Sequence, residues 1–171
     1  MIDYDLKRIK ALAFDVDGVL SAGTIQTNDG VLMRSVNTKD GYALRLAMTE
    51  GLHVAIITGA HEQAIRSRYE GIGIHDVFLG SSVKTESLKV LLDRYGLSAN
   101  EVLYMGDDIP DYEIMKQVGL PCCPRDAAPE IRDISLYVSH IDGGMGCARD
   151  VIEQVLKAQG KWMADKEAFS W

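Results

Sequence analysis

Short apolar runs of strand length alternate with helix-like stretches along most of this chain. Five runs predict β-strands: Ala11–Phe14, His53–Thr58, Val77–Leu79, Val102–Met105 and Tyr137–Ser139. Five stretches with apolar residues at helical spacing predict helices: Gly41–Glu50, His61–Gly71, Val83–Tyr95, Tyr112–Val118 and Cys147–Gln159. Short buried strands that alternate with helices are typical of a parallel sheet with helices on both faces. The pattern therefore predicts an α/β protein with a Rossmann-like, doubly wound parallel sheet.

One segment, Gly23–Val36, departs from this alternation. Its residues alternate around Asn28-Asp29-Gly30, which is a strong signal for a β-hairpin, and we expect that hairpin to project from the sheet. The chain has 171 residues, enough for one domain with a real core, so we expect a single domain over residues 1–171. Its tail, over about residues 160–171, is polar with two tryptophans and is expected either to be mobile or to dock on a partner subunit.

Polar residues stand where three of the predicted strands end. Asp15 and Asp17 follow the first strand, Thr58 ends the second, and Asp107 follows the strand Val102–Met105. Ligands of doubly wound sheets bind beyond the carboxyl ends of the strands, so these side chains are expected to share one crevice. Ionised carboxylates are costly to bury without a partner. Because magnesium prefers carboxylate and phosphate oxygens, Mg²⁺ is the partner we expect.

The same crevice is expected to hold phosphate. The pair Thr58-Gly59 offers a hydroxyl and backbone amides of the kind that cradle phosphate, and Lys84 supplies a positive charge at a predicted helix start. Two further acids, Asp108 and Asp111, follow Asp107 in "GDDIPD". Charge neutralisation, positioning and one nucleophile are what phosphoryl transfer needs.

Each of these features also has a purely structural interpretation. Asp-x-Asp-Gly also opens calcium loops, but the EF-hand pattern would then place ligands where Val19 and Gln26 stand. Asp108, just before Pro110, is equally typical of a helix cap, and Asp111 of an acid in the first turn of a helix. The order of these residues and their common position at strand ends favour a catalytic site over these separate structural roles.

Charge and cysteine content narrow the possible partners and the compartment. The net charge of −7 provides no basic surface for nucleic acid or an anionic membrane. Two of the three cysteines are adjacent, which makes a poor disulfide framework, and there is no Cys-x-x-Cys pair for zinc. The first twenty residues are too charged for a signal peptide, and no stretch approaches a transmembrane span. We therefore expect a cytoplasmic protein.

Four motifs, in order, resemble those of the haloacid dehalogenase superfamily of phosphohydrolases: "FDVDGVL", "IITG", Lys84 and "GDDIPD". The resemblance implies that Asp15 is the nucleophile and forms an aspartyl-phosphate. It implies that Asp17 is the general acid and base and that its backbone carbonyl helps Asp15 and Asp107 to bind magnesium. Thr58, Gly59 and Lys84 would bind the phosphoryl group, with Asp108 in support.

The spacing of these motifs leaves no room for the cap domain that many relatives insert. The whole chain resembles the capless, tetrameric 3-deoxy-D-manno-octulosonate 8-phosphate phosphatases, through "KDGYAL", "GDDIPD", "GGMGCARD" and "LKAQGKW" as well as the hairpin. That resemblance implies a phosphorylated sugar acid as substrate, in lipopolysaccharide sugar synthesis. It also implies a homotetramer in which neighbouring subunits close each active site. Lys39 and Arg149, and Asp111 in support, are further candidate site residues.

The chain departs from the family pattern next to Thr58. The arginine that often follows the second motif is replaced by Ala60, and Arg66 or Arg68 is a possible substitute. A nine-carbon sialic-type acid 9-phosphate is therefore the alternative substrate. Two other classes, a phosphoacceptor signalling domain and a catalytically silent binding module, fit less well. The motif order differs from that of phosphoacceptor domains, and every chemical position of the phosphatase motifs is filled.

Overall fold

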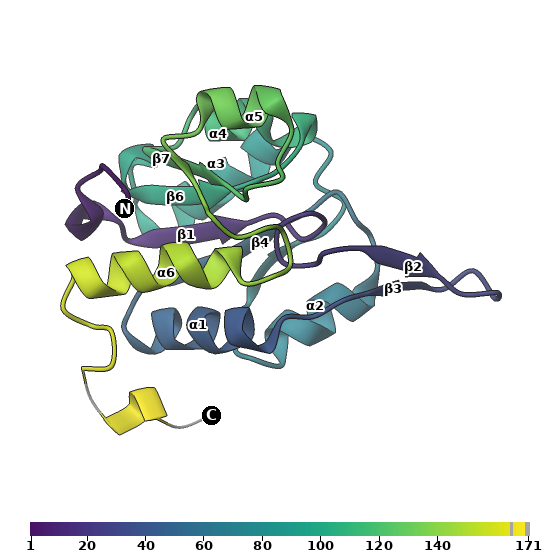
Figure 1. The fold of residues 1–171 in the computed structure, drawn as a ribbon, viewed down its shortest axis with the longest axis horizontal. Helices are drawn as coiled ribbons and strands as arrows, with labels where there is room; N and C mark the ends of the chain where they lie inside the picture. The colour runs from purple at the N-terminus through teal and green to yellow at the C-terminus, as the bar shows by residue number, and fades with distance from the viewer. Residues whose placement is uncertain (165, 170–171) are drawn as a thin grey trace.

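The central strand of the fold is the first apolar run of the sequence. In a computed structural model, which describes residues 1–164 and 166–169, six parallel strands form one sheet in the order β5-β4-β1-β6-β7-β8 (Figure 1). They are β1 (Ala11–Phe14), β4 (His53–Ile57), β5 (Asp76–Phe78), β6 (Val102–Met105), β7 (Leu120–Cys123) and β8 (Tyr137–Val138). The predicted doubly wound α/β fold is confirmed.

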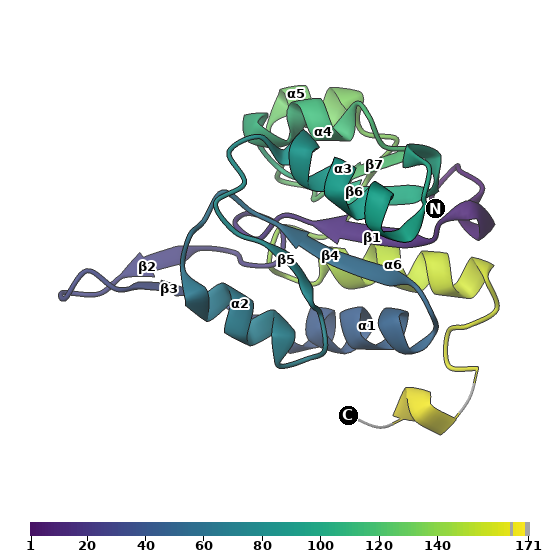
Figure 2. The same ribbon diagram turned by 180° about the vertical axis from the view of Figure 1, so that it is seen from behind.

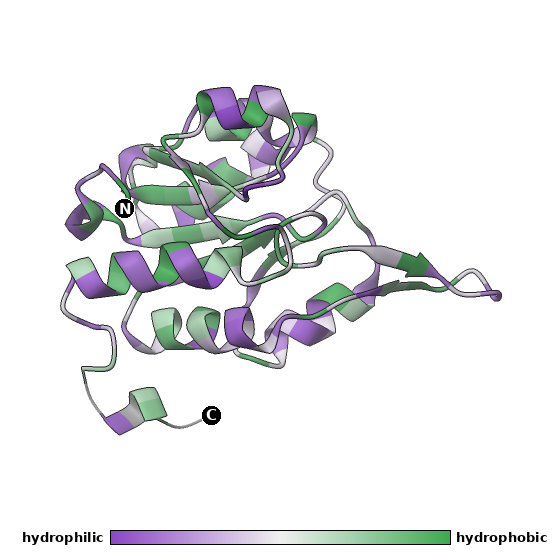
Figure 3. Ribbon diagram, in the orientation of Figure 1, coloured by the Kyte–Doolittle hydropathy of each residue, from purple (hydrophilic) through white to green (hydrophobic). Residues whose placement is uncertain are grey.

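Helices cover both faces of the sheet, so β1 is buried on both sides. Leu12 and Phe14 face one core, and Ala11 and Ala13 face the other. One face is covered by α1 (Thr38–Thr49), α2 (Gln63–Glu70) and α6 (Cys147–Ala158). The other is covered by α3 (Lys84–Tyr95), α4 (Tyr112–Met115) and α5 (Pro129–Ile134) (Figures 1 and 2). Apolar residues concentrate in the strands and on the inner helix faces (Figure 3).

The sequence pattern missed one strand and one helix, β7 and α5. The strand β7 contains Pro121, which lacks a backbone N–H and argues against a central strand. It is nevertheless buried at all four residues, and the Pro121 carbonyl accepts a hydrogen bond from the Leu136 N–H at 2.9 Å. The helix α5 has only six residues, too few for a periodic signal. Four short 3₁₀ helices complete the described elements: η1 (Leu6–Arg8), η2 (Ala99–Glu101), η3 (Ile109–Asp111) and η4 (Lys166–Phe169).

The predicted hairpin is present and projects well beyond the sheet (Figure 1). Its strands β2 (Thr24–Gln26) and β3 (Leu32–Arg34) pair antiparallel, and Gly30 in the turn has a φ of 82°, which favours glycine. In the described residues, only this hairpin and α1 separate Asp17 from β4, so no cap domain is inserted there.

The loop after β1 is held in place by the loop before α6. The Gly144 N–H donates to the Val19 carbonyl at 2.7 Å, and a Cβ on Gly143 would lie 1.9 Å from the Gly18 carbonyl oxygen. Asn37, and not Asp40, caps α1, because its side chain accepts from the Lys39 and Asp40 amides. The Asp40 carboxylate instead accepts from the Arg149 N–H at 2.7 Å, in the first turn of α6.

The described part of the C-terminal tail packs on α1 of its own chain. Trp162 meets Tyr42 edge-on, with ring centroids 6.3 Å apart, and Ala168 is buried and accepts a hydrogen bond from the Tyr42 hydroxyl. Residues 165, 170 and 171 of the predicted tail, including Trp171, lie outside the described residues. Among the helices described, none has the length and apolar character needed to cross a bilayer.

Candidate active site

Three neighbouring strands bring their carboxyl ends to one crevice. Asp15 follows β1, Thr58 follows β4 and Asp107 follows β6, and β1 lies between the other two strands in the sheet. The chain turns from β1 toward β4 and β5 on one side and toward β6, β7 and β8 on the other, so the crevice is a topological switch point. A pocket of about 590 Å³ opens there, lined by Asp15, Asp17, Leu32, Arg34, Thr58, Gly59, Ala60, His61, Glu62, Ser81, Ser82, Lys84 and Pro110.

A buried ion-pair network forms the floor of this pocket. The Lys84 ammonium lies 2.9 Å from a carboxylate oxygen of Asp15 and 2.6 Å from one of Asp111. The Tyr104 hydroxyl donates to the same Asp111 oxygen at 2.6 Å, and the Asp107 amide donates to the other at 3.0 Å. The four residues that take part through their side chains are each at least nine-tenths buried: Asp15, Lys84, Tyr104 and Asp111. Asp111 is therefore the anchor that holds Lys84 beside Asp15.

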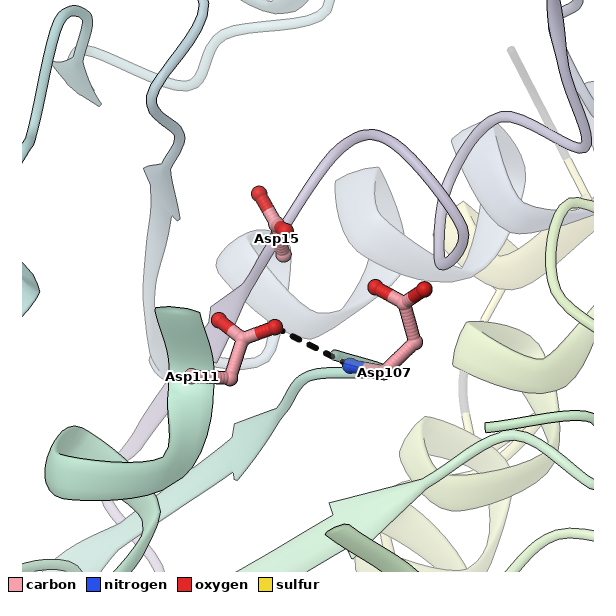
Figure 4. Close-up of side chains that lie close together, drawn as sticks. All are labelled: Asp15, Asp107 and Asp111. Atoms are coloured by element: carbon pink, nitrogen blue, oxygen red, sulfur yellow. Dashed lines mark hydrogen bonds between the residues drawn. The ribbon is translucent and has the colours of Figure 1, made fainter. Parts of the chain in front are cut away.

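Three carboxylates converge next to Lys84. One oxygen each from Asp15, Asp107 and Asp111 lies within 4.8 Å of the others, and Figure 4 shows the three side chains close together, with Asp111 accepting from the Asp107 amide. Burial, together with the charge of Asp111, raises the pKa of Asp15 to about 6 although Lys84 opposes the shift. Burial and the charges of Asp111 and Asp15 raise the pKa of Asp107 to about 7. Carboxylates that resist ionisation in this way fit a hard divalent cation.

Asp17 turns away from that cluster and toward the hairpin. The Arg34 guanidinium binds it with two hydrogen bonds, from Nε to Oδ1 at 2.7 Å and from a terminal nitrogen to Oδ2 at 3.0 Å. The Thr24 hydroxyl also donates to Oδ1 at 3.1 Å. The carboxylate of Asp17 is thus bound by both strands of the hairpin, and any metal contact by this residue would have to use its backbone carbonyl.

The remaining residues expected at the phosphate end lie at the pocket. Thr58 is buried, and its hydroxyl accepts from the Ala60 amide at 3.2 Å, while Gly59 is exposed and lines the pocket. Asp108 is exposed and caps η3 by accepting from the Ile109 amide at 2.8 Å, which is the structural role considered for it. Its neighbour Asp111 is far more than an acid in a first helical turn, because it anchors Lys84.

Three further candidates from the sequence do not line this pocket. Lys39 is exposed on the first turn of α1. Arg66 donates to the Val77 carbonyl at 2.7 Å and lines a neighbouring pocket of about 350 Å³. Arg149 lies over the rings of Tyr42 and Trp162, 5.7 and 5.3 Å from their centroids. Within this chain the structure brings none of the three to Asp15.

Sequence reasoning missed three residues of the site: Arg34, Glu62 and Tyr104. Arg34 is the basic residue in an otherwise apolar stretch of the hairpin, "GVLMRSV", which was the available signal. Glu62 lies 3.4 Å from the Arg34 guanidinium, and nothing in its local sequence marks it. Tyr104 sits in an apolar strand, where a tyrosine is most simply a core residue.

Comparison with known proteins gives consistent results. Residues 73–142 match the family model of haloacid dehalogenase-like hydrolases. The 3-deoxy-D-manno-octulosonate 8-phosphate phosphatase of Salmonella typhi is 39% identical over 156 residues, which cover 91% of this chain and 83% of that protein.

Solved structures are similar along most of their length. The 3-deoxy-D-manno-octulosonate 8-phosphate phosphatase of Yersinia pestis matches with a TM-score of 0.89 and 35% identity, over 92% of this chain and 85% of that one. The enzyme of Moraxella catarrhalis, in complex with a magnesium ion, a phosphate ion and KDO, matches with a TM-score of 0.91 and 30% identity, over 97% and 96%. The chain therefore belongs to the haloacid dehalogenase-like hydrolases and, within them, to the family of 3-deoxy-D-manno-octulosonate 8-phosphate phosphatases.

Proposed function

We propose that this chain is a magnesium-dependent phosphatase that hydrolyses 3-deoxy-D-manno-octulosonate 8-phosphate to the free sugar acid and phosphate. Its family membership makes it a phosphoric monoester hydrolase. The observation that carries the proposal is the placement of Asp15, with Lys84 at 2.9 Å, on the floor of a pocket at the switch point of the sheet. A nucleophile, a fixed cation and a carboxylate cluster are together what transfer of a phosphoryl group requires.

In the first step, a carboxylate oxygen of Asp15 attacks the phosphorus of the substrate. One Asp15 oxygen accepts from the Val16 amide at 2.7 Å and the other faces Lys84, so the side chain is held in a fixed orientation. As the bond to Asp15 forms, the bond between phosphorus and the sugar oxygen breaks, and Asp17 gives its proton to that oxygen. Lys84 and the Thr58 hydroxyl bind the phosphoryl oxygens in this step, and the proposal is supported by the fact that both residues line the pocket.

In the second step, water releases the phosphate from Asp15. Asp17, now a carboxylate, takes a proton from the water as the water oxygen attacks phosphorus, and the bond from phosphorus to Asp15 breaks. Inorganic phosphate leaves, and Asp15 is regenerated as a carboxylate with Asp17 protonated. Asp111 does not touch the reacting atoms in this scheme, because its role is to keep Lys84 in place.

Asp15 and Asp107, with the backbone carbonyl of Asp17, are the residues that would hold magnesium. The fit rests on the three carboxylates that converge here and on the raised pKa values of Asp15 and Asp107. A bound magnesium ion supplies positive charge that neutralises the phosphoryl oxygens and the carboxylates around them.

Magnesium should raise the melting temperature of the protein, and more so at pH 8 than at pH 5.5. The pKa values of Asp15 and Asp107, about 6 and about 7, lie above the ordinary value of 3.8, so ionising these groups costs folding stability. That cost is fully present above about pH 7 and is lost as the pH falls toward 3.8, because the two carboxyl groups become protonated and no longer need a cation to balance their charge. With magnesium tenfold above its dissociation constant, a rise of about 3–6 °C is expected at pH 8.

Differential scanning fluorimetry with and without magnesium chloride at the two pH values measures this effect. Asp107→Asn should remove most of the rise, whereas Asp133→Asn, at an exposed position on α5, should keep it. An equal rise in the Asp107→Asn variant would exclude this carboxylate as a ligand.

The substrate is tested by comparing kcat/KM, with magnesium present, on a matched pair of sugar acids. One is 3-deoxy-D-manno-octulosonate 8-phosphate and the other is a nine-carbon ulosonate 9-phosphate, the alternative that the loss of arginine at Ala60 leaves open. We expect at least a tenfold preference for the eight-carbon acid, which corresponds to about 1.4 kcal/mol of differential transition-state binding. A preference for the nine-carbon acid would replace the proposed substrate and keep the reaction.

We further infer that the protein works in the cytoplasm as a homotetramer in which neighbouring subunits close each site. Apolar side chains on the projecting hairpin are well exposed in the single chain, with Ile25 at 71% and Met33 at 57%. An exposed apolar surface of this kind is typical of an interface between subunits. A monomeric mass in light scattering at working concentration would contradict this inference.

A further inference from the structure

Arg34 is the feature of the pocket that the mechanism above does not use. Side chains alternate along a strand, so Leu32 and Arg34 of β3 share a face, and both line the pocket that contains Asp15. The Arg34 side chain is only 13% exposed. The hairpin thus sends one nearly buried guanidinium into the active site of its own chain.

The two hydrogen bonds from Arg34 occupy both oxygens of Asp17. A guanidinium fork that matches a carboxylate in this way is among the stronger pairings that side chains make. The Asp17 carboxylate bound in this way is directed at the hairpin and presents no proton to a leaving oxygen. For Asp17 to serve as general acid and base, Arg34 has to release it, and the freed carboxylate then takes up a proton from solvent before it can donate one to the leaving oxygen.

Glu62 provides Arg34 with a second anchor. It lies beside the first turn of α2, and one of its carboxylate oxygens is 3.4 Å from the remaining terminal nitrogen of the guanidinium. Since Asp17 and Glu62 contact different nitrogens, Arg34 can release Asp17 while Glu62 keeps its side chain in the pocket.

Arg34 is also the cation available to a second anionic group of a substrate. Among the residues that line the pocket, Arg34 and Lys84 are the ones with a permanent positive charge. Lys84 is committed to Asp15 and Asp111 at the phosphate end. The position next to Thr58-Gly59 holds Ala60, which contributes no charge.

Resting on the proposed function, we propose that Arg34 exchanges Asp17 for the carboxylate of the sugar acid, so that recognition of the acid frees Asp17 to reach the leaving oxygen. The exchange replaces one carboxylate by another in the same guanidinium fork, so the two hydrogen bonds that Arg34 loses are matched by the two that it forms, and Asp17 gives up in addition the hydrogen bond from the Thr24 hydroxyl. A phosphate ester without a carboxylate cannot make this exchange. Arg34 is then a specificity-determining residue that links substrate selection to the release of the general acid.

The alternative is that the Arg34–Asp17 pair only fastens the hairpin to the sheet. The two interpretations differ in what happens to selectivity when Arg34 is changed. If the pair is only a fastener, substrates with and without a carboxylate should be affected to the same degree. If Arg34 reads the carboxylate, the loss should fall selectively on the acid.

The experiment measures kcat/KM for 3-deoxy-D-manno-octulosonate 8-phosphate and for p-nitrophenyl phosphate, with magnesium, in wild type, Arg34→Ala and Arg34→Lys. We expect the ratio of the two values to fall about 10- to 100-fold in Arg34→Ala, as is typical for loss of a hydrogen-bonded charged partner. Arg34→Lys keeps the charge without the fork, so its ratio should lie between those of wild type and Arg34→Ala. Arg132→Ala, at an exposed position on α5, is the matched control and should leave the ratio unchanged.

An unchanged ratio in both Arg34 variants would overturn this inference, and the lysine variant decides the question if the alanine variant does not fold. A wild type that hydrolyses p-nitrophenyl phosphate but not the sugar acid would overturn the proposed substrate and, with it, the role of Arg34. A wild type that prefers the acid, with variants that keep that preference, would overturn the role of Arg34 alone.

Discussion

Replacing Asp15 by asparagine should abolish turnover, with a fall in kcat of about 10⁴-fold or more. An amide oxygen is a far weaker nucleophile than a carboxylate, and in the proposed mechanism no other group attacks phosphorus. The fold should survive, because asparagine keeps an acceptor for the Val16 amide and the burial that raises the pKa of Asp15 already disfavours its charge. Single-turnover assays with magnesium measure the rate, and a thermal melt checks the fold.

The control for this variant is Asp133→Asn on α5, which changes the same chemistry at an exposed position and should leave kcat unaltered. Wild-type enzyme that is quenched with acid during turnover of the substrate should also carry a phosphoryl group on Asp15. Mass spectrometry of the peptide that contains Asp15 detects this group. Residual activity within about 100-fold of wild type would mean that Asp15 is not the nucleophile.

The parts of the molecule that could be predicted from the sequence are those set by local pattern. Strands such as Ala11–Phe14 and Val102–Met105 have the same bounds in the structure as in the prediction, because each is an unbroken apolar run. Since all six strands are parallel, Asp15, Thr58 and Asp107 necessarily meet at one edge of the sheet. The general position of the site therefore follows from the pattern alone.

The parts that could not be predicted depend on packing between distant segments. The pairing of Arg34 with Asp17 requires the angle at which the hairpin leaves the sheet, and no local pattern encodes that angle. The direction of Arg66 depends in the same way on how α2 lies against β5, where Arg66 binds the Val77 carbonyl instead of entering the pocket. The strand β7 was missed because its proline contradicts local strand propensity, while its burial between β6 and β8 overrides that propensity.

Lys84 contributes both to the stability of the fold and to the proposed chemistry, so its replacement should have large effects on both. Its side chain is 4% exposed and lies between two carboxylates, at 2.9 Å from Asp15 and 2.6 Å from Asp111. Lys84→Met should lower the free energy of unfolding by about 3 kcal/mol at pH 7, because it leaves buried carboxylates without their partner. It should also lower kcat/KM by about 10²–10³-fold, the usual cost of losing one group that stabilises charge in a transition state.

A second variant separates the two effects. In Lys84→Met with Asp111→Asn, the uncompensated charge at Asp111 is removed while asparagine still accepts from the Asp107 amide and can pair with the Tyr104 hydroxyl. We expect urea unfolding to show that most of the lost stability returns, whereas kcat/KM stays as low as in the single variant. Recovery of activity together with stability would mean that Lys84 acts only as a structural counter-ion. A single variant as stable as wild type would mean that the ion pair does not anchor the pocket floor. If stability recovers in the double variant while kcat/KM does not, then Lys84 binds the phosphoryl group and Asp111 holds Lys84 in place.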